Sequence, residues 1–209
     1  MSQGLKVELV VVIADDALDA IVIALLLHKL NGRRVAGLFR PSKLGVDNVG
    51  ENLSTYIHLG FKQVKYLVVV DQEEMTLEEV WQRLESSLRQ HGLPYTVVKM
   101  GERWRLYKVE HELLKFNLAV AVNDLETPFL KHSIEDHLIH LATLKGEISE
   151  EDLRGHETAK EAWKTILKKK KGLHEEIYKE ILGGERAAIH EAFKQHLEAI
   201  ENLLPRETP

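Results

Sequence analysis

The chain contains no cysteine among its 209 residues. Disulfide bonds, thiolate metal sites and cysteine nucleophiles are therefore all excluded. Long apolar runs are lacking as well, since none approaches the roughly 20 residues of a membrane-spanning helix. The first residues show neither the basic segment nor the cleavage site of a secretory signal. These absences predict a cytoplasmic protein with no membrane partner.

An excess of positive charge is also absent. With 28 Lys and Arg residues against 33 Asp and Glu residues, the formal net charge is −5. The molecule as a whole therefore does not attract nucleic acid, and a polyanion would have to be met by a local basic patch or through a metal. The charged fraction of 29%, rich in Lys and Glu, is compatible with a thermophilic source.

Short apolar runs alternate with helical patterns over the first two thirds of the chain. This alternation predicts βαβ units and an α/β fold with a mainly parallel central sheet flanked by helices. Thr76, with Glu79 three residues later, has the pattern of a helix-capping box. We expect strands at 7–14, 34–39, 65–70, 95–100 and 116–122 and helices at 16–30, 48–59 and 76–90, with 101–115 left unassigned.

The C-terminal third has a different character. From residue 132 to residue 204 the sequence contains helical patterns separated by glycines. We therefore expect an α/β domain at 1–145 and a C-terminal helical extension at 146–209. The extension either packs on the sheet or acts as a lid or partner surface.

Acidic residues follow two of the buried strands at the point where each strand ends. Asp15, Asp16 and Asp19 follow the first strand, and Asp71 and Glu73 follow the third. Because the carboxyl ends of parallel strands meet at one edge of a sheet, these carboxylates should converge there. Carboxylates brought together repel one another unless a cation lies between them. The pattern therefore predicts a divalent metal site.

The order of these motifs resembles a known family. A strand is followed by the acidic turn IADDALD and a helix, then by a strand ending in VVVDQEE, and later by SIEDH at a helix start. This order resembles the TOPRIM domain of topoisomerases, bacterial-type primases, OLD-family nucleases and small stand-alone archaeal and bacterial proteins. The resemblance covers about residues 7–142. It implies a Rossmann-like fold and Mg²⁺- or Mn²⁺-dependent phosphodiester chemistry.

The resemblance also assigns roles to individual residues. In the TOPRIM family a Glu follows the first strand, usually as E-G-x-x-D, and Asp-x-Asp follows the third. Asp15 falls on that Glu and Asp19 on the Asp four residues later, so both are expected to be catalytic. Asp71 and Glu73 fall on the Asp-x-Asp pair and would hold the metal together with Asp15. Further acidic candidates are Asp16, Glu135 and Asp136, the last two resembling a late Glu-Asp pair of the stand-alone members.

The chain departs from the family pattern at two positions. Asp15 is one methylene shorter than the family Glu, and Asp16 occupies the position of the family glycine. Withdrawing a catalytic carboxylate by roughly 1.5 Å can lower a rate by about 10². Glu73 still offers an oxygen to a hard cation. Metal binding should therefore tolerate these departures better than catalysis does.

The same acidic residues also have structural interpretations. Asp15 or Asp16 could be the N-cap of the first helix, where acidic residues suit the helix dipole. Glu73 could belong to a solvated acidic face. Ser133 and Asp136 have the spacing of a helix cap, and for Glu135 the structural and functional interpretations stay equally open.

Among the basic residues, Arg40 and Lys43 are the phosphate-binding candidates, because they follow the second strand at the expected active edge. The lysines at 168–171 have the pattern of a solvated helix end, with a phosphate contact as the alternative. The eleven histidines show no zinc-ligand spacing, and the helical positions of Trp81 and Trp163 favour the core.

Three functions remain open at this point. The first is a metal-dependent TOPRIM-type nuclease, which the retained acidic set favours slightly. The second is a degenerate TOPRIM module that binds metal, nucleic acid or a protein without turnover. The third is a nucleoside-hydrolase-like activity with Ca²⁺, because DDALDAIVIALLL also resembles the Asp-rich first loop of that family. The type of nucleic acid and a homo-oligomeric state are left open.

Overall fold

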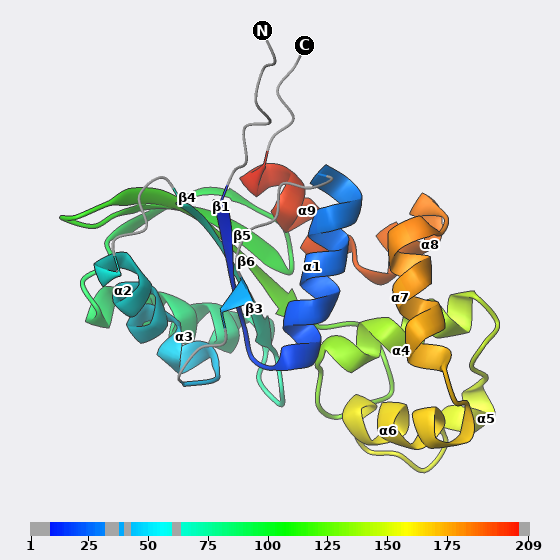
Figure 1. Cartoon of the computed structure of the whole chain (residues 1–209). Helices are drawn as coiled ribbons and strands as arrows, with labels where there is room; N and C mark the ends of the chain where they lie inside the picture. The colour runs from blue at the N-terminus through cyan, green and yellow to red at the C-terminus, as the bar shows by residue number, and fades with distance from the viewer. Residues whose placement is uncertain (1–8, 32–37, 40–42, 60–63, 205–209) are drawn as a thin grey trace, which may run out of the picture.

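A six-stranded mixed sheet lies between two layers of helices in the computed structural model (Figure 1), which describes residues 9–31, 38–39, 43–59 and 64–204. The strand order is β2-β1-β3-β6-β5-β4. The first four strands in that order are parallel, and β5 is antiparallel to both of its neighbours. The strands are β1 (Leu9–Ala14), β2 (Leu38–Phe39), β3 (Val64–Asp71), β4 (Tyr95–Met100), β5 (Trp104–Glu110) and β6 (Lys115–Asn123).

Helices connect the parallel strands and fill the C-terminal third. Those of the first half are α1 (Ala17–Asn31), the 3₁₀ turn η1 (Val46–Asn48), α2 (Val49–His58) and α3 (Leu77–Gln90). Those of the second half are α4 (Ile134–Leu144), α5 (Glu150–Leu153), α6 (Ala159–Lys169), α7 (Leu173–Gly183), α8 (Arg186–Ala192) and α9 (Lys194–Leu203).

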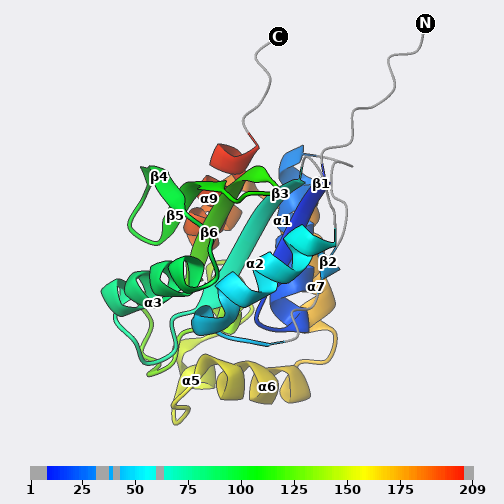
Figure 2. The same ribbon diagram turned by 90° about the vertical axis from the view of Figure 1, so that its left-hand side faces the viewer.

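The central strands are buried on both faces, which is why their sequences are continuous apolar runs. Along β1 the side chains alternate between two cores. Val10 and Val12 belong to the core shared with α1, α4 and α9, whereas Val11 and Ile13 belong to the core shared with α2 and α3. Figure 2 shows α2 and α3 on one side of the sheet. The predicted α/β fold with a mainly parallel sheet at its centre is confirmed.

Of the helices after residue 146, α9 packs on the sheet itself, whereas α6, α7 and α8 pack on α1 and α4. Trp163 of α6, Ile177 of α7 and Ile200 of α9 belong to the same buried cluster as Val10 of β1 and Ala121 of β6. Helix α9 lies against β6 and β5. The finer expectations, a Rossmann-like TOPRIM fold and a separate extension beginning at 146, stay predictions.

Local signals placed several elements correctly. The Thr76 side chain accepts the Glu79 N–H, and the Glu79 carboxylate accepts the Thr76 N–H at 2.8 Å, so the predicted capping box begins α3. Trp81 and Trp163 are both buried in cores. The unassigned range 101–115 contains β5, and part of the strand predicted at 34–39 lies outside the described residues. Of the helices described, none has both the length and the apolarity that crossing a membrane requires.

Candidate acidic site at the carboxyl ends of the strands

A buried asparagine joins two of the predicted carboxylates. The register of the parallel pair β3 and β6 places Asp71 beside Asn123 at the ends of these strands. The Asn123 side chain is fully buried, and its Nδ2 donates to Asp19 Oδ1 at 2.6 Å and to Asp71 Oδ1 at 2.7 Å. Asp19, in the first turn of α1, and Asp71 are thus bridged by one amide group.

Asp15 is engaged in a different direction. Its Oδ1 accepts the backbone N–H of Gly45 at 2.8 Å, just before η1, and its Oδ2 accepts the backbone N–H of Asp71 at 3.2 Å. Burial raises the pKa of Asp15, although these two N–H donors act to lower it. Asp15 therefore fastens the loop before η1 to the end of β3, while Asp19 lies on the α1 side of the same edge.

Asp16 is the N-cap of α1. Its Oδ1 accepts the N–H of Leu18 at 2.7 Å and that of Asp19 at 3.2 Å, and its Oδ2 pairs with Lys160 Nζ at 3.1 Å. Burial acts to raise the pKa of Asp16, but hydrogen bonds from Asp19 and Lys160 outweigh it and lower the pKa. Of the two capping candidates, Asp16 takes the role, which leaves Asp15 free of it.

Charge repulsion is concentrated at Asp19 and Asp71. Burial raises the pKa of each carboxyl well above its ordinary value, and the charge of Asp71 raises the pKa of Asp19 further. Asp15, Glu135 and Glu73 raise the pKa of Asp71 further, and the Asn123 amide and the charge of Lys160 oppose the rise. A proton or a cation would relieve this repulsion, so Asp71 is the electrostatic centre of the site.

Glu73 has an unusual backbone conformation two residues after β3. Its φ is +55°, in the left-handed region that disfavours residues with a Cβ. Two backbone hydrogen bonds with His132 hold it there, at 3.3 and 3.4 Å. Its carboxylate is exposed, at 3.9 Å from Lys131 Nζ. A non-glycine residue in this conformation is consistent with a role for its side chain.

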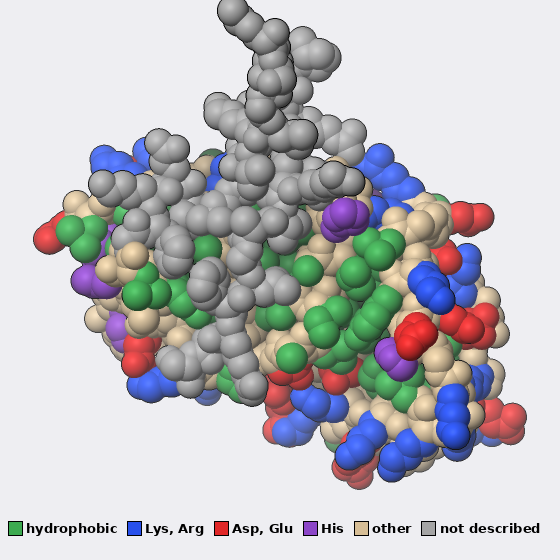
Figure 3. Space-filling view, viewed as in Figure 1, with side chains coloured by type: hydrophobic (Ala, Val, Ile, Leu, Met, Phe, Trp, Pro, Cys, Tyr) green, Lys and Arg blue, Asp and Glu red, His purple; other side chains and the backbone are tan. Residues whose placement is uncertain are grey.

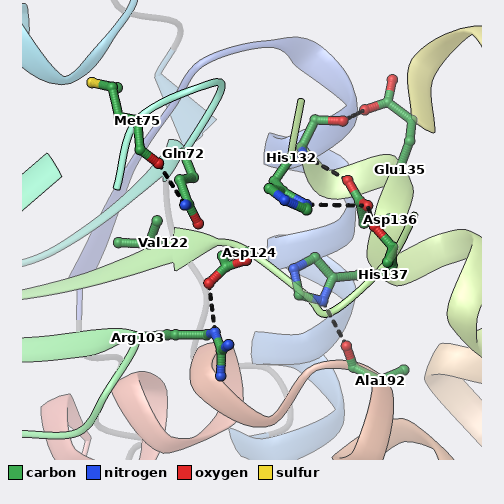
Figure 4. Close-up of polar contacts among 12 residues, drawn as sticks. Gln72, Met75, Arg103, Val122, Asp124, His132, Glu135, Asp136, His137 and Ala192 are labelled. Carbon is green, nitrogen blue, oxygen red and sulfur yellow. Dashed lines mark hydrogen bonds and ion pairs between the residues drawn. The ribbon is translucent and has the colours of Figure 1, made fainter. Parts of the chain in front are cut away.

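The start of α4 separates the roles of Glu135 and Asp136. Asp136 accepts the Ser133 N–H at 2.8 Å and the Thr127 hydroxyl at 2.5 Å, so it caps the helix as its spacing predicted. Glu135 accepts the Ser133 hydroxyl at 2.8 Å, and burial raises its pKa (Figure 4). Because Glu135 also raises the pKa of Asp71, it belongs to the electrostatic environment of the site, whereas Asp136 is structural.

A pocket of about 360 Å³ opens over these carboxylates. Two cations line it, Lys160 from α6 and Arg83 from α3, the latter paired with Asp47 at 3.1 Å. Of the predicted phosphate-binding residues, Lys43 pairs with Glu51 at 2.7 Å, and Arg40 lies outside the described residues. The acidic residues lining the pocket are Asp15, Asp16, Asp47, Asp71 and Glu73.

The site is not a closed metal cage. Within the ranges that the structure describes, no three His, Asp or Glu side chains are placed to hold one ion. The directions of the carboxylates explain this, since Asp15 is bound toward Gly45 and Asp19 toward Asn123, with Asp71 between them. Mg²⁺ is usually held by one or two carboxylates and several waters. This all-oxygen donor set fits such a cation.

The sequence motifs include neither Asn123 nor His196, although both are buried next to the acidic residues. His196 of α9 is fully buried, and its Nε2 lies 2.7 Å from Asn123 Oδ1. Asn123 had a usable signal, because it ends a buried apolar run as Asp71 does. No local pattern marks His196, which lies 73 residues further along the chain.

Tests against protein-family models, curated proteins and solved structures gave no match for this chain, so the functional proposal depends on the residues of the site.

Proposed function

We propose that the protein is a Mg²⁺- or Mn²⁺-dependent hydrolase of nucleic-acid phosphodiesters. One observation carries this proposal: Asp71 lies half-buried at the end of β3 beside an open pocket, where the carboxylates of Asp15, Glu73 and Glu135 raise its pKa and its own charge raises the pKa of Asp19. A divalent cation would offset that repulsion and draw a phosphate group into the pocket.

Asp71 would hold the cation, with Asp15, Asp19 or Glu73 as a second carboxylate and water in the remaining positions. When bound, such a cation polarises a phosphoryl oxygen and lowers the pKa of its water. The protein supplies the proton transfer. Asp15 suits this task, because burial brings its pKa closer to neutral pH, where a general acid or base is most effective.

The two cations at the pocket would orient the phosphate. Lys160 pairs with Asp16, and Arg83 pairs with Asp47, both at 3.1 Å. The cationic side chains are more than half exposed, and exposed ion pairs contribute little to stability, so a phosphate can replace the carboxylate. On the face seen in Figure 3, Lys and Arg are interspersed with Asp and Glu, which also favours individual contacts over a broad basic surface.

A non-catalytic module that binds metal or nucleic acid is the second candidate. The observation that favours it is the engagement of Asp15, whose two oxygens each accept a backbone N–H. A carboxylate with this role holds the loop before η1 in place and needs no chemistry. The same residue therefore decides between the two functions.

Cleavage of labelled single- and double-stranded DNA and RNA with Mg²⁺ or Mn²⁺ tests the proposal. If Asp15 transfers the proton, Asp15→Ala lowers the rate by about 10² or more, and Asp15→Glu, which restores the family length, raises it. Asp47→Ala, which removes another carboxylate of the pocket, is the control and leaves the chemical step intact. If the wild type and Asp15→Glu are inert on every substrate while metal binds, the non-catalytic module replaces the nuclease.

Binding of the nucleic acid is tested separately with Ca²⁺ as a non-supporting cation. Lys160→Ala and Arg83→Ala should each reduce the slope of log K against log salt by about 0.7 to 0.9, the value for one lost phosphate contact. Lys108→Ala removes an exposed lysine from a pair with Glu110, outside the pocket, and serves as the matched control. If the variant that combines Lys160→Ala and Arg83→Ala leaves the slope unchanged, the phosphate binds elsewhere.

A further inference from the structure

A chain of buried polar groups connects helix α9 to the acidic site. His196 Nε2 contacts Asn123 Oδ1 at 2.7 Å, and Asn123 Nδ2 donates to Asp19 at 2.6 Å and to Asp71 at 2.7 Å. His196 and Asn123 have no exposed surface, and Asp19 is 1% exposed. This arrangement links the imidazole to the two carboxylates through a single amide.

The imidazole can support either orientation of that amide. In the orientation of the structure, His196 Nε2–H donates to Asn123 Oδ1. With the amide turned over, Asn123 Nδ2 donates to Nε2 instead, and the ring proton lies on Nδ1. Among the described residues, none is a hydrogen-bond partner of the buried His196 Nδ1, so the tautomer with the proton on Nδ1 leaves an N–H donor unpaired and has to be stabilised by the cation. The ring stays neutral in both.

The two orientations suit different states of the carboxylates. The present one directs two N–H donors at Asp19 and Asp71, which satisfies them in the absence of a cation. The other directs an oxygen at the same two carboxylates, which is favourable only if a cation lies among the three oxygens. Oxygen ligands about 2.1 Å from Mg²⁺ lie about 3.0 Å apart. The present distances from Asn123 Nδ2 to Asp19 Oδ1 and Asp71 Oδ1, 2.6 and 2.7 Å, are close to that separation.

We infer that Asn123 is a third oxygen ligand of the cation, that its amide turns over when the cation binds, and that His196 is the positioning residue for both orientations. The ring proton moves from Nε2 to Nδ1, and the net charge of His196 is unchanged. The inference rests on the cation of the proposed function and adds to it the donor that the acidic residues alone do not supply.

The competing role for Asn123 is purely structural. As a fixed hydrogen-bond donor, it would compete with a cation for Asp19 and Asp71, and removing it would strengthen metal binding. As a ligand that turns over, it contributes to metal binding, and removing it weakens the affinity. The two roles therefore predict opposite effects of one substitution.

Nitrogen NMR of the His196 ring tests the inference in the wild-type protein, titrated with Mg²⁺. The signals are assigned by their loss in His196→Gln. The expected result is that the protonated ring nitrogen changes from Nε2 to Nδ1 as Mg²⁺ saturates the protein. If the protonated ring nitrogen is the same with and without Mg²⁺, the inference is overturned.

The variants Asn123→Leu and Asn123→Asp provide the second test, with Mg²⁺ affinity measured by calorimetry and by the rise in Tm. Asn123→Leu should weaken Mg²⁺ binding about tenfold or more. Asn123→Asp should lower the metal-free Tm and increase the rise caused by Mg²⁺, because it adds a third carboxylate. Asn202→Leu, on the same helix as His196, is the control. Equal or tighter Mg²⁺ binding by Asn123→Leu overturns the inference, and the NMR titration decides if this variant does not fold.

The outcomes separate this inference from the proposed nuclease. Mg²⁺ binding with the tautomer change but without cleavage of any substrate supports the inference and contradicts the nuclease. Cleavage of a substrate with an unchanged His196 tautomer supports the nuclease and contradicts the inference. No Mg²⁺ binding by the wild type contradicts both.

Discussion

At the scale of single residues, Glu73 has a strained backbone conformation at the edge of the site. It is the only non-glycine residue with a positive φ in the part of the chain that the structure describes. A left-handed conformation costs a residue with a Cβ roughly 1–2 kcal/mol. The turn after β3 has Glu at this position, although glycine would adopt the same φ without strain.

Glu73→Gly is therefore expected to raise the metal-free free energy of unfolding by up to about 1 kcal/mol, through relief of the left-handed strain. It should also weaken Mg²⁺ binding, because a carboxylate is lost from the pocket. Urea unfolding with and without Mg²⁺ measures both effects. Glu74→Gly removes the neighbouring exposed carboxylate without a positive φ and should give no gain in stability. A loss of stability in Glu73→Gly would contradict the assignment of strain.

Asp71→Asn should raise the metal-free Tm and abolish most of the rise caused by Mg²⁺. The amide removes the repulsion that raises the pKa of Asp19 and Asp71, and it also removes the central ligand. Thermal unfolding over a series of Mg²⁺ concentrations measures both. Asp47→Asn, at the rim of the same pocket, is the matched control. An unchanged response to Mg²⁺ in Asp71→Asn would rule out a shared site.

The acidic pair also predicts an unusual pH dependence without metal. A carboxyl whose pKa is raised by folding contributes stability that is present below its unfolded pKa and is lost as pH rises through the folded pKa. The free energy of unfolding should therefore gain a falling component above the ordinary Asp value of 3.8. Urea unfolding of wild type and Asp71→Asn from pH 4 to pH 8 isolates the contribution of Asp71, which the variant lacks. The same dependence of the free energy of unfolding on pH in the wild type and in Asp71→Asn would contradict the raised pKa of Asp71.

At the scale of elements, the contact between α4 and the C-terminal helices contains two buried histidines. His137 Nδ1 donates to the Ala192 carbonyl at 2.7 Å, and its ring contacts the rings of Phe193 and His196 (Figure 4 shows the first of these contacts). Burial lowers the pKa of His137 from 6.5 to about 4. Protonation at this contact is therefore unfavourable.

The contact between α4 and the C-terminal helices should be destabilised in acid. A histidine with a lowered pKa contributes stability that is present above pH 6.5 and is lost as pH falls toward 4, by up to roughly 3 kcal/mol. The sign is opposite to that of the Asp19 and Asp71 pair in the same range. His137→Gln retains a side-chain N–H donor and should flatten the acid limb of the urea-unfolding profile. His174→Gln, at an exposed histidine, should not.

Elements with a strong local signal were predictable. Continuous apolar runs identified β1, β3 and β6, and Thr76 with Glu79 identified the start of α3. Strand β5 was not assigned, because Arg105 and Lys108 interrupt its apolar pattern; it is an antiparallel strand between two others. That pairing depends on residues distant in sequence, which a local pattern does not contain.

The candidate site was predictable in position but not in its connections. Strand ends placed Asp15 and Asp71 at one edge of the sheet, where the structure has them. Their side-chain directions depend on partners from other elements, namely Gly45 for Asp15 and Asn123 for Asp71. Lys160 reaches the pocket only because α6 folds back across this edge, so the spacing of charges along the chain could not reveal it.

At the scale of the whole molecule, the C-terminal helices complete one of the two cores of the sheet. Val12 of β1, Leu67 of β3 and Ala119 of β6 share a buried cluster with residues of α6, α7 and α9. A fragment ending at the predicted boundary of residue 145 would expose this apolar face. Such a face is expected to prevent stable folding.

Circular dichroism of the fragment 1–145 tests the boundary. We expect no cooperative thermal transition, whereas the whole chain should unfold in one transition. Coexpression with a separate 146–209 chain should restore the transition if the helices act only by covering the sheet. A cooperative transition of the fragment alone would support the predicted division into a domain and an extension.

The pairing of Asp71 with Asn123 has a consequence for which insertions and deletions the chain tolerates. Both residues lie at strand ends, and their neighbours Val70 and Val122 face the opposite core. One residue inserted within β6 would turn Asn123 away from Asp19 and put an apolar side chain in its place, because strand side chains alternate. The lengths of β3 and β6 are therefore coupled, and a change of length in one strand would preserve the site only if it comprised two residues and the other strand changed with it.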